Sequence, residues 1–477
     1  MEKPNILLIT TDQQRFDTIA ALGNNEIYTP HLNWLVDEGI SFTRSYSDCP
    51  VCMPARATIM TGKPAYSHGL LDNHNNKLPM AENQTFPSIL CKNGYQTRAE
   101  GKLHFYPMRT YYGIEHADLP MDYFNEMRKY GKSSTRTHGV GENEMEPYIN
   151  AIDEKDTLTH WIVDKSIDFI ENRDPTRPFF LWTSFPKPHP PLDPNLSYWE
   201  LYRDAPLSQP VTGDWSKEID KHPNAYYELT YRLNNIQRMS EHQLMQIKRA
   251  YYACITQLDY NLGLLFARMR ELNLMENTWI IFTSDHGEML GDHKMGAKSV
   301  FLEGSAHIPM IIKPPAKFGE SHEKYSGVRC DKIVTLADVM PTILSLCGLE
   351  CPEDIEGNNM LEYLENGQEQ SFYGNYADIY FAVIDKEWKY LWTSLGGTEL
   401  MFNLANDPYE RLNLADKKEY AQIKEHLKNI MVSEMKKSSP NLVKDGVPIV
   451  KEYTLSPNDI PRFPGLNTTI FPRDSFH

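Results

Sequence analysis

Short apolar runs that end in polar residues alternate along the chain with segments in which apolar residues recur every three or four positions. The runs predict buried strands, and the periodic segments predict amphipathic helices. Such alternation is typical of a largely parallel sheet covered by helices on both faces, so the sequence predicts an α/β fold. We expect strands at 6–10, 40–46, 95–99, 179–184 and 279–282, and helices at 29–39, 158–170, 240–272 and 334–346.

Two long segments and the C-terminal part depart from this scheme. Residues 105–155 and 186–240 are rich in Tyr, Pro, Asp and His without clear periodicity, and long excursions of this kind are often functional. Beyond a Cys-, Pro- and Gly-rich stretch near 347–358, antiparallel strands are expected at 381–392 and a helix at 420–435. We therefore expect a main domain at 1–370 and a C-terminal subdomain at 371–477 with a small antiparallel sheet, a helix and an irregular tail.

The composition narrows the class of protein. The chain has 477 residues, of which 41% are hydrophobic and 23% charged, which is ordinary for a globular protein. Its apolar runs are far shorter than the roughly 18 residues of a membrane span, so no membrane segment is expected. The net charge of -16 argues against nucleic acid as the main partner, and any anionic substrate has to be attracted locally.

The N-terminus gives evidence on the cellular compartment, and the cysteines give evidence on thiol chemistry. The chain enters an apolar run at once, with no basic segment and no small-residue cleavage site. We expect a cytoplasmic protein as the sequence stands, or a periplasmic or secreted one if a leader has been removed. The seven cysteines form no array of the zinc-binding kind, so most are expected to be free thiols.

Candidate metal ligands follow two of the expected strands. Asp12 and Gln13 come after the first strand, and Asp285 and His286 follow the strand at 279–282. The carboxyl ends of parallel strands meet at one edge of a sheet, so these side chains are expected to converge. Two carboxylates, an amide oxygen and an imidazole suit Ca²⁺, Mn²⁺ or Mg²⁺, whereas zinc more often takes thiolates or several histidines. We expect one divalent cation here, with Ca²⁺ favoured.

The sharpest local pattern is the run Cys52-Met53-Pro54-Ala55-Arg56, followed by Thr61-Gly62. It resembles the signature of the sulfatases, CxPxR followed by a TG pair, a family in which the cysteine is converted after synthesis to formylglycine. The resemblance extends over most of the chain, to Asp12, Lys102, His104, His189, Asp285, His286, Lys298 and the 404–414 segment. It implies an alkaline-phosphatase-like sandwich, with a large mixed, mostly parallel sheet between helices and a small C-terminal α+β subdomain.

The motif also has a physical reason. Pro54 suits a first helical turn, so residue 52 is expected at a helix N-terminus, where free N–H groups and the helix dipole favour an anion. A hydrated aldehyde there carries two hydroxyls: one can bind the metal and attack, and the other can later expel sulfate. A thiol cannot perform the second step. We therefore expect formylglycine at Cys52 and a formylglycine-generating enzyme as a maturation partner.

The resemblance also implies roles for the remaining site residues. Arg56 would support the formylglycine, while Lys102 and Lys298 would bind the sulfate oxygens. His104 would take the proton from the formylglycine hydroxyl, and His189 would bind the substrate and protonate the leaving alcohol. Three basic side chains and the cation against two carboxylates leave a local balance of about +3, which attracts an anion despite the overall charge.

The leading function is hydrolysis of a sulfate monoester, such as a sulfated sugar or another small organic sulfate. Two positions depart from many sulfatases, which carry Asp where this chain has Gln13 and Asn where it has His286. This pattern is similar to the branch that includes choline sulfatases and phosphonate monoester hydrolases, so hydrolysis of a phosphonate monoester or a phosphodiester stays open as the alternative. A binding protein without activity is less favoured, because every expected polar position is occupied.

Overall fold

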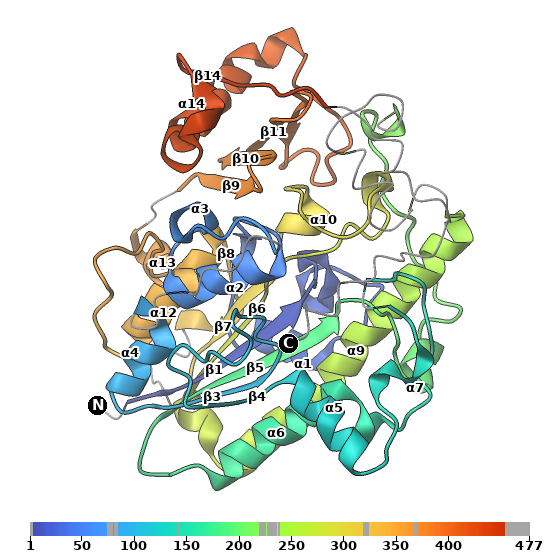
Figure 1. The fold of residues 1–477 in the computed structure, drawn as a ribbon, viewed down its shortest axis with the longest axis vertical. Coiled ribbons are helices and arrows are strands. Elements are labelled where there is room, and N and C mark those ends of the chain that lie inside the picture. Colours follow the sequence, from blue (N-terminus) through green and yellow to red (C-terminus); the bar gives the residue numbers. More distant parts are fainter. Residues whose placement is uncertain are drawn as a thin grey trace.

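The main sheet has the architecture that the apolar runs predict. The computed structural model describes residues 3–73, 80, 84–141, 143–218, 226, 236, 239–317, 324–366 and 370–453. Within these residues, eight strands form one sheet in the order β4-β3-β5-β1-β6-β7-β2-β8 (Figure 1). Only β7 runs antiparallel to its neighbours, β6 and β2. The expected α/β fold with a mixed, mostly parallel sheet is confirmed.

The central strand is β1 (Asn5–Asp12), whose neighbours are β5 (Phe179–Pro188) and β6 (Thr278–Ser284). Beyond β5 lie β3 (Gln96–Gly101) and β4 (His116–Asp118). Beyond β6 lie β7 (Met310–Lys313), β2 (Ile40–Tyr46) and β8 (Val328–Thr335). The central strands are buried on both faces, which is why their sequences read as continuous apolar runs.

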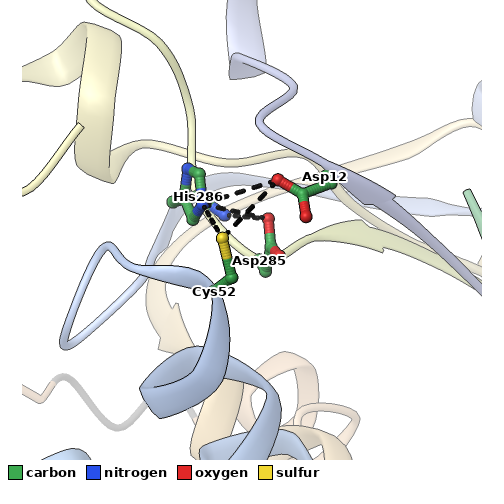
Figure 2. Close-up of side chains that lie close together, drawn as sticks. All are labelled: Asp12, Cys52, Asp285 and His286. Carbon is green, nitrogen blue, oxygen red and sulfur yellow. Dashed lines mark hydrogen bonds and ion pairs between the residues drawn. The ribbon is translucent and has the colours of Figure 1, made fainter. Parts of the chain in front are cut away.

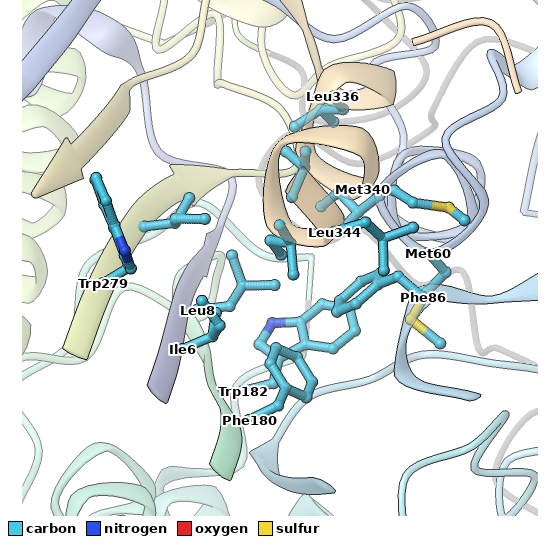
Figure 3. Packing of buried hydrophobic residues seen from close by; sticks show 14 of the residues in the cluster. Ile6, Leu8, Met60, Phe86, Phe180, Trp182, Trp279, Leu336, Met340 and Leu344 are labelled. Atoms are coloured by element: carbon cyan, nitrogen blue, oxygen red, sulfur yellow. The ribbon is translucent and has the colours of Figure 1, made fainter. Parts of the chain in front are cut away.

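Alternation along the strands divides the core into two layers. Ile6 and Leu8 point to the face covered by α2 (Cys52–Thr61), α4 (Phe86–Lys92) and α12 (Val339–Leu346), as Figure 3 shows. Leu7 and Ile9 point to the opposite face. That face is covered by α1 (Pro30–Asp37), α5 (Pro120–Lys129), α6 (Leu158–Asn172) and α9 (Glu241–Glu271). Each such fully buried aliphatic side chain stabilises the fold by about 1.5–3 kcal/mol, so both layers hold the sheet in place.

Element boundaries agree with the sequence in most places and differ in one. The helix expected at 240–272 is confirmed as α9, and Ser240 caps it, because its hydroxyl accepts from the backbone N–H of Gln243. The helix expected at 334–346 was wrong at its start: Val334 and Thr335 pair with β2 as the last residues of β8, and a single turn at Leu336–Asp338 precedes α12. Because a short apolar run suits a strand and a buried helix equally well, periodicity alone misplaced this boundary.

A second sheet follows the main one in the chain. Within the described residues it has four antiparallel strands, namely β9 (Phe372–Tyr376), β10 (Tyr380–Asp385), β11 (Trp388–Thr393) and β12 (Glu399–Asn403). The helix α14 (Ala421–Ser438) packs on one face of this sheet, and the other face packs against residues of the main domain such as Tyr46 and Phe301. Figure 1 shows this sheet and α14 together at one end of the molecule. The expected antiparallel strands and helix are confirmed, and the division at residue 370 stays a prediction.

Shorter elements complete the structure. They are α3 (Ala65–His68), α7 (Leu196–Glu200), α10 (Glu303–Ala306), α13 (Glu362–Asn366) and the pair β13 (Val443–Lys444) and β14 (Val447–Pro448). The segment at 105–155, expected as an excursion, contributes β4 and α5 to the main domain. Across the described residues, no helix combines the length and the apolar character that a bilayer crossing requires. All seven cysteines are free thiols.

Candidate active site

The candidate site lies where four neighbouring parallel strands end. Asp12 is the last residue of β1, and Asp285 follows β6 directly, beside it in the register. Lys102 follows β3, and His189 follows β5. The His189 backbone N–H donates to the Asp12 carbonyl at 3.0 Å, which ties these two strand ends together. The sheet therefore collects side chains that are far apart in the sequence, as expected for the carboxyl edge of a parallel sheet.

Gly101 allows β3 to end close against β5. Its φ is +98°, and a Cβ at this position would lie 2.0 Å from the carbonyl oxygen of Ser184. Only glycine tolerates both conditions. The close approach lets the Lys102 N–H donate to the same carbonyl at 2.9 Å. The Lys102 ammonium then forms an ion pair with Asp12 and lies 4.0 Å from the Cys52 sulfur.

Cys52 is the first residue of α2, and its sulfur points into the cluster (Figure 2). The sulfur lies 3.2 Å from His286 Nε2 and 3.8 Å from Asp12 Oδ1. Candidate ligand atoms of Asp12, Cys52, Asp285 and His286 all lie within 4.8 Å of one another, and the four residues are buried. Two carboxylates and an imidazole at this spacing fit a divalent cation that prefers oxygen and accepts nitrogen.

Arg56 contacts both carboxylates of the cluster. Its side chain is fully buried, and Nε donates to Asp285 Oδ2 at 3.0 Å while Nη2 lies 3.6 Å from Asp12 Oδ2. Nη1 donates to the Lys102 carbonyl at 2.5 Å and to the Ser184 hydroxyl at 2.9 Å. One guanidinium thus joins β1, β3, β5 and β6 at their ends. Through these contacts Arg56 fixes the positions of the Asp12 and Asp285 carboxylates relative to each other.

The pKa values of the two carboxylates in the cluster are shifted in opposite directions. Burial opposes ionisation of Asp12, but Lys102 and the neighbouring histidines outweigh it and lower the pKa of Asp12 well below its ordinary value. Burial and the charge of Asp12 raise the pKa of Asp285. Two carboxylates that repel each other in a buried site favour a cation between them. This preference supports the fit of the donor set to a metal ion.

The Cys52 thiol lies in a strongly positive setting. Burial and Asp12 oppose its ionisation, yet Lys102, Lys298 and His286 outweigh them and lower the pKa of Cys52 well below its ordinary value. The pKa of His286 is raised, because Asp285 and Cys52 outweigh its burial. The same positive groups that favour a thiolate favour any anion at the start of α2.

Glu288 belongs to the site, although the sequence reasoning missed it. Its carboxylate is fully buried and accepts from the Gln13 side-chain N–H group, from Leu290 N at 3.0 Å and from Ala297 N at 2.5 Å. Gln13, expected as a metal ligand, turns its amide oxygen to the Lys298 ammonium. Burial raises the pKa of Glu288, and in its ionised form Glu288 lowers the expected local balance from +3 to +2. The only sequence signal was an acidic residue two positions after His286, inside the Asp-His-Gly-Glu run.

The two remaining histidines occupy different positions. His189 is half-buried, and its Nδ1 lies 2.8 Å from the Pro190 carbonyl, which leaves Nε2 as the ring atom for a substrate. Burial and the charge of Lys298 lower the pKa of His189 well below its ordinary value. His104 is exposed and lines a small cavity together with Met53 and Ala57 of α2. Among the described residues, the polar contacts of the Cys52 sulfur are with Asp12, Lys102 and His286 and do not include His104.

Two protein-family models match this chain. The family model described as Sulfatase matches residues 4–349, and the one described as N-sulphoglucosamine sulphohydrolase, C-terminal, matches residues 291–437. The chain is 33% identical over 486 residues to an arylsulfatase of Clostridium perfringens (strain 13 / Type A). This alignment covers 95% of this chain and 98% of the relative.

Two solved structures share the fold. The phosphonate monoester hydrolase of Agrobacterium radiobacter superposes with a TM-score of 0.77 and 23% identity, over 94% of this chain and 100% of that one. A second protein, solved in complex with its substrate D-glucosamine-2-N,6-O-disulfate, gives a TM-score of 0.72 and 23% identity, over 92% and 99% of the two chains.

Proposed function

This chain belongs to the sulfatase family of the alkaline phosphatase superfamily and hydrolyses sulfate esters, and we propose that it does so with a formylglycine made from Cys52 and one divalent cation. The observation that carries the proposal is the position of Cys52. It begins α2, and its sulfur lies among Asp12, Asp285 and His286 (Figure 2). A group that replaces the thiol at this atom would face both the candidate cation ligands and the basic side chains.

The residues that would hold the proposed cation are Asp12, Gln13, Asp285 and His286. A divalent ion at this place supplies Lewis-acid polarisation of an oxygen and lowers the pKa of a bound hydroxyl group. The oxygen-rich set favours Ca²⁺, and the imidazole admits Mn²⁺, with Mg²⁺ as a third candidate. Arg56 would keep the two carboxylates in place through its contacts with both.

The proposed formylglycine supplies, in its hydrated form, both a nucleophilic hydroxyl and a second hydroxyl that allows sulfate to leave. Lys102, 4.0 Å from the Cys52 sulfur, and Lys298 bind the sulfate oxygens. His104, which lines the cavity beside Met53, would take the proton from the formylglycine hydroxyl. Maturation of Cys52 requires a formylglycine-generating enzyme as a partner. These assignments follow from the family resemblance and from the positions of the side chains.

His189 is the proposed proton donor to the leaving alcohol. Its Nδ1 faces the Pro190 carbonyl, so Nε2 is the atom that binds the ester oxygen and delivers the proton. In the free protein, burial and Lys298 lower the pKa of His189. A bound sulfate ester brings a negative charge that opposes Lys298, and this favours the protonated ring when the donor is needed.

The proposed substrate is a sulfated sugar or another small organic sulfate. Support comes from the family match and from the fold neighbour that was solved with a sulfated glucosamine. The local balance of +2 attracts a sulfate monoester, which carries one negative charge. A small anion of this kind needs no extended basic surface, in agreement with a chain whose net charge is -16.

A phosphonate monoester or phosphodiester is the second candidate substrate. Gln13 and His286 stand where many sulfatases carry Asp and Asn, and the phosphonate monoester hydrolase of Agrobacterium radiobacter shares the fold. The test compares kcat/KM for matched aryl sulfate, phosphodiester and phosphonate esters on one matured preparation, followed by sulfated mono- and disaccharides. We expect the sulfates to be turned over most efficiently. Faster turnover of phosphorus esters with the same leaving group than of every sulfate would replace the first proposal with the second.

A further inference from the structure

The side-chain amide of Gln13 has to be oriented by its neighbours. An amide oxygen accepts hydrogen bonds and binds cations, whereas the NH₂ group only donates, so the two ends are chemically opposite although they have nearly the same shape. Gln13 is 1% exposed and cannot turn to water. Its nitrogen donates to Glu288, and its oxygen accepts from the Lys298 ammonium.

Glu288 is itself held in place by the backbone. Its Oε1 accepts from Leu290 N at 3.0 Å and from Ala297 N at 2.5 Å, which leaves Oε2 for Gln13. The Met289 N–H donates to the Ala297 carbonyl at 2.8 Å and closes the loop around the carboxylate. Oε2 accepts the side-chain N–H of Gln13, so Gln13 presents its NH₂ group to the carboxyl group of Glu288. The loop from 288 to 298 thus supplies the acceptor for the nitrogen and, in Lys298, the donor for the oxygen.

We propose that Glu288 is a positioning residue that fixes Gln13 with its amide oxygen toward Lys298, beside the residues of the cation site. The inference rests on the proposed cation site and extends it by one residue outside the ligand set. The backbone N–H of Gln13 donates to Asp285 Oδ1 at 3.1 Å, which places this residue beside the ligand cluster. Lys298 favours the same orientation because an ammonium only donates, but without Glu288 the buried NH₂ group of Gln13 would lose its acceptor. Partners of this kind commonly change metal affinity by 10- to 100-fold.

The test begins with Glu288→Gln, which keeps the shape and removes the charge. The N–H groups of Leu290 and Ala297 still require an oxygen, so the new amide turns its NH₂ group toward Gln13. The Gln13 amide then has to rotate by half a turn and presents nitrogen, in place of oxygen, on the side of Lys298. We expect the Kd for Ca²⁺ and for Mn²⁺, each measured alone by equilibrium dialysis, to rise by about 10- to 100-fold. KM for an aryl sulfate should rise as well, because Lys298 loses its acceptor.

The double variant Gln13→Glu with Glu288→Gln distinguishes orientation from loss of charge. It has the same net charge as the wild type, and the new carboxylate at 13 accepts from the amide at 288 and from Lys298 while offering oxygen to the cation. We expect its Kd for both ions to return to the wild-type value or below. Glu171→Gln is the matched control, because it removes one carboxylate from a partly exposed ion pair with Arg268 and should leave the Kd unchanged.

The outcomes separate this inference from the proposed function. Absence of cation binding in the wild type would refute the proposed cation. Binding in the wild type with an unchanged Kd in Glu288→Gln, or a weakened Kd that the double variant does not restore, would overturn the role of Glu288. If Glu288→Gln unfolds, recovery of both folding and cation binding in the double variant supports the orientation, and unfolding of both variants contradicts it.

Discussion

Lys389 holds the C-terminal sheet against the segment that carries Lys298, and its removal gives the most quantitative test of the structure. Its ammonium is fully buried and donates to the Phe301 carbonyl at 2.9 Å, to Glu303, and to Glu410 Oε1 at 2.9 Å. Although burial opposes ionisation, Lys389 and a neighbouring histidine lower the pKa of Glu303 well below its ordinary value. Burial raises the pKa of Glu410 to about 7.

Lys389→Met keeps most of the aliphatic volume and removes the charge. Glu410, which is 1% exposed, then retains only the backbone N–H of Glu303 as a hydrogen-bond donor in the contacts of the described residues. Leaving one member of a buried ion pair without its partner costs about 3–5 kcal/mol. The whole fold is worth about 5–15 kcal/mol, so we expect the variant to lose a large part of its stability. A loss of 4 kcal/mol corresponds to a nearly thousandfold larger unfolded fraction.

The assay is urea unfolding of wild type and variants at pH 5 and pH 8. Without Lys389 the pKa of Glu410 rises further, so the stability of the variant should fall as the pH increases and the loss should be larger at pH 8. The variant Lys389→Met with Glu410→Gln should regain more than half of the loss. Lys437→Met, which removes an exposed ion pair with Glu434, is the control and should change stability by less than about 1 kcal/mol. A loss below about 1 kcal/mol for Lys389→Met at both pH values would refute the reasoning.

Four further predictions concern the chemistry and the pH dependence. Cys52→Ala should abolish turnover and change the free energy of unfolding by only about 1 kcal/mol. Peptide mass spectrometry should find the aldehyde in the active wild type, and full activity with an intact cysteine would contradict the mechanism. Chelation should remove activity, and Asp285→Ala should lose both the metal, measured by elemental analysis, and activity; a fully active metal-free protein would exclude the cation. His189→Ala should slow sugar sulfates far more than activated phenyl sulfates, because a good leaving group departs without a proton; equal losses would assign His189 to binding alone. Burial raises the pKa of Glu100 from 4.5 to about 8, so the native state binds the proton more tightly and its stability falls as the pH rises from 4.5 to 8. At about 1.4 kcal/mol per pKa unit, Glu100→Gln should be more stable than the wild type by a few kcal/mol at pH 8 and nearly equal to it at pH 4.5 in urea unfolding. A constant difference across this range would show that Glu100 does not titrate as stated.

Much of the fold could be predicted because local patterns carry it. The strands around β1 are buried on both faces, so they appear as short apolar runs, and the helical spacing of apolar residues after Ser240 indicates α9. The convergence of Asp12 and Asp285 could also be predicted, since both follow parallel strands whose ends meet at one edge. The start of the helix after β8 could not be predicted, because an apolar run of a few residues satisfies either structure.

The sequence by itself determined the fold class, the order of the elements, the motif that places Cys52 at the start of a helix and the residues that follow the central strands. These features depend on the pattern of neighbouring residues, which the chain displays directly. Only the tertiary structure decided which polar atoms meet across strands and loops. Arg56 reaches Asp12 and Asp285 through a contact that spans three elements, and Glu288 acts on Gln13 across 275 positions of the chain. Such contacts arise from packing in three dimensions, and no periodicity records them.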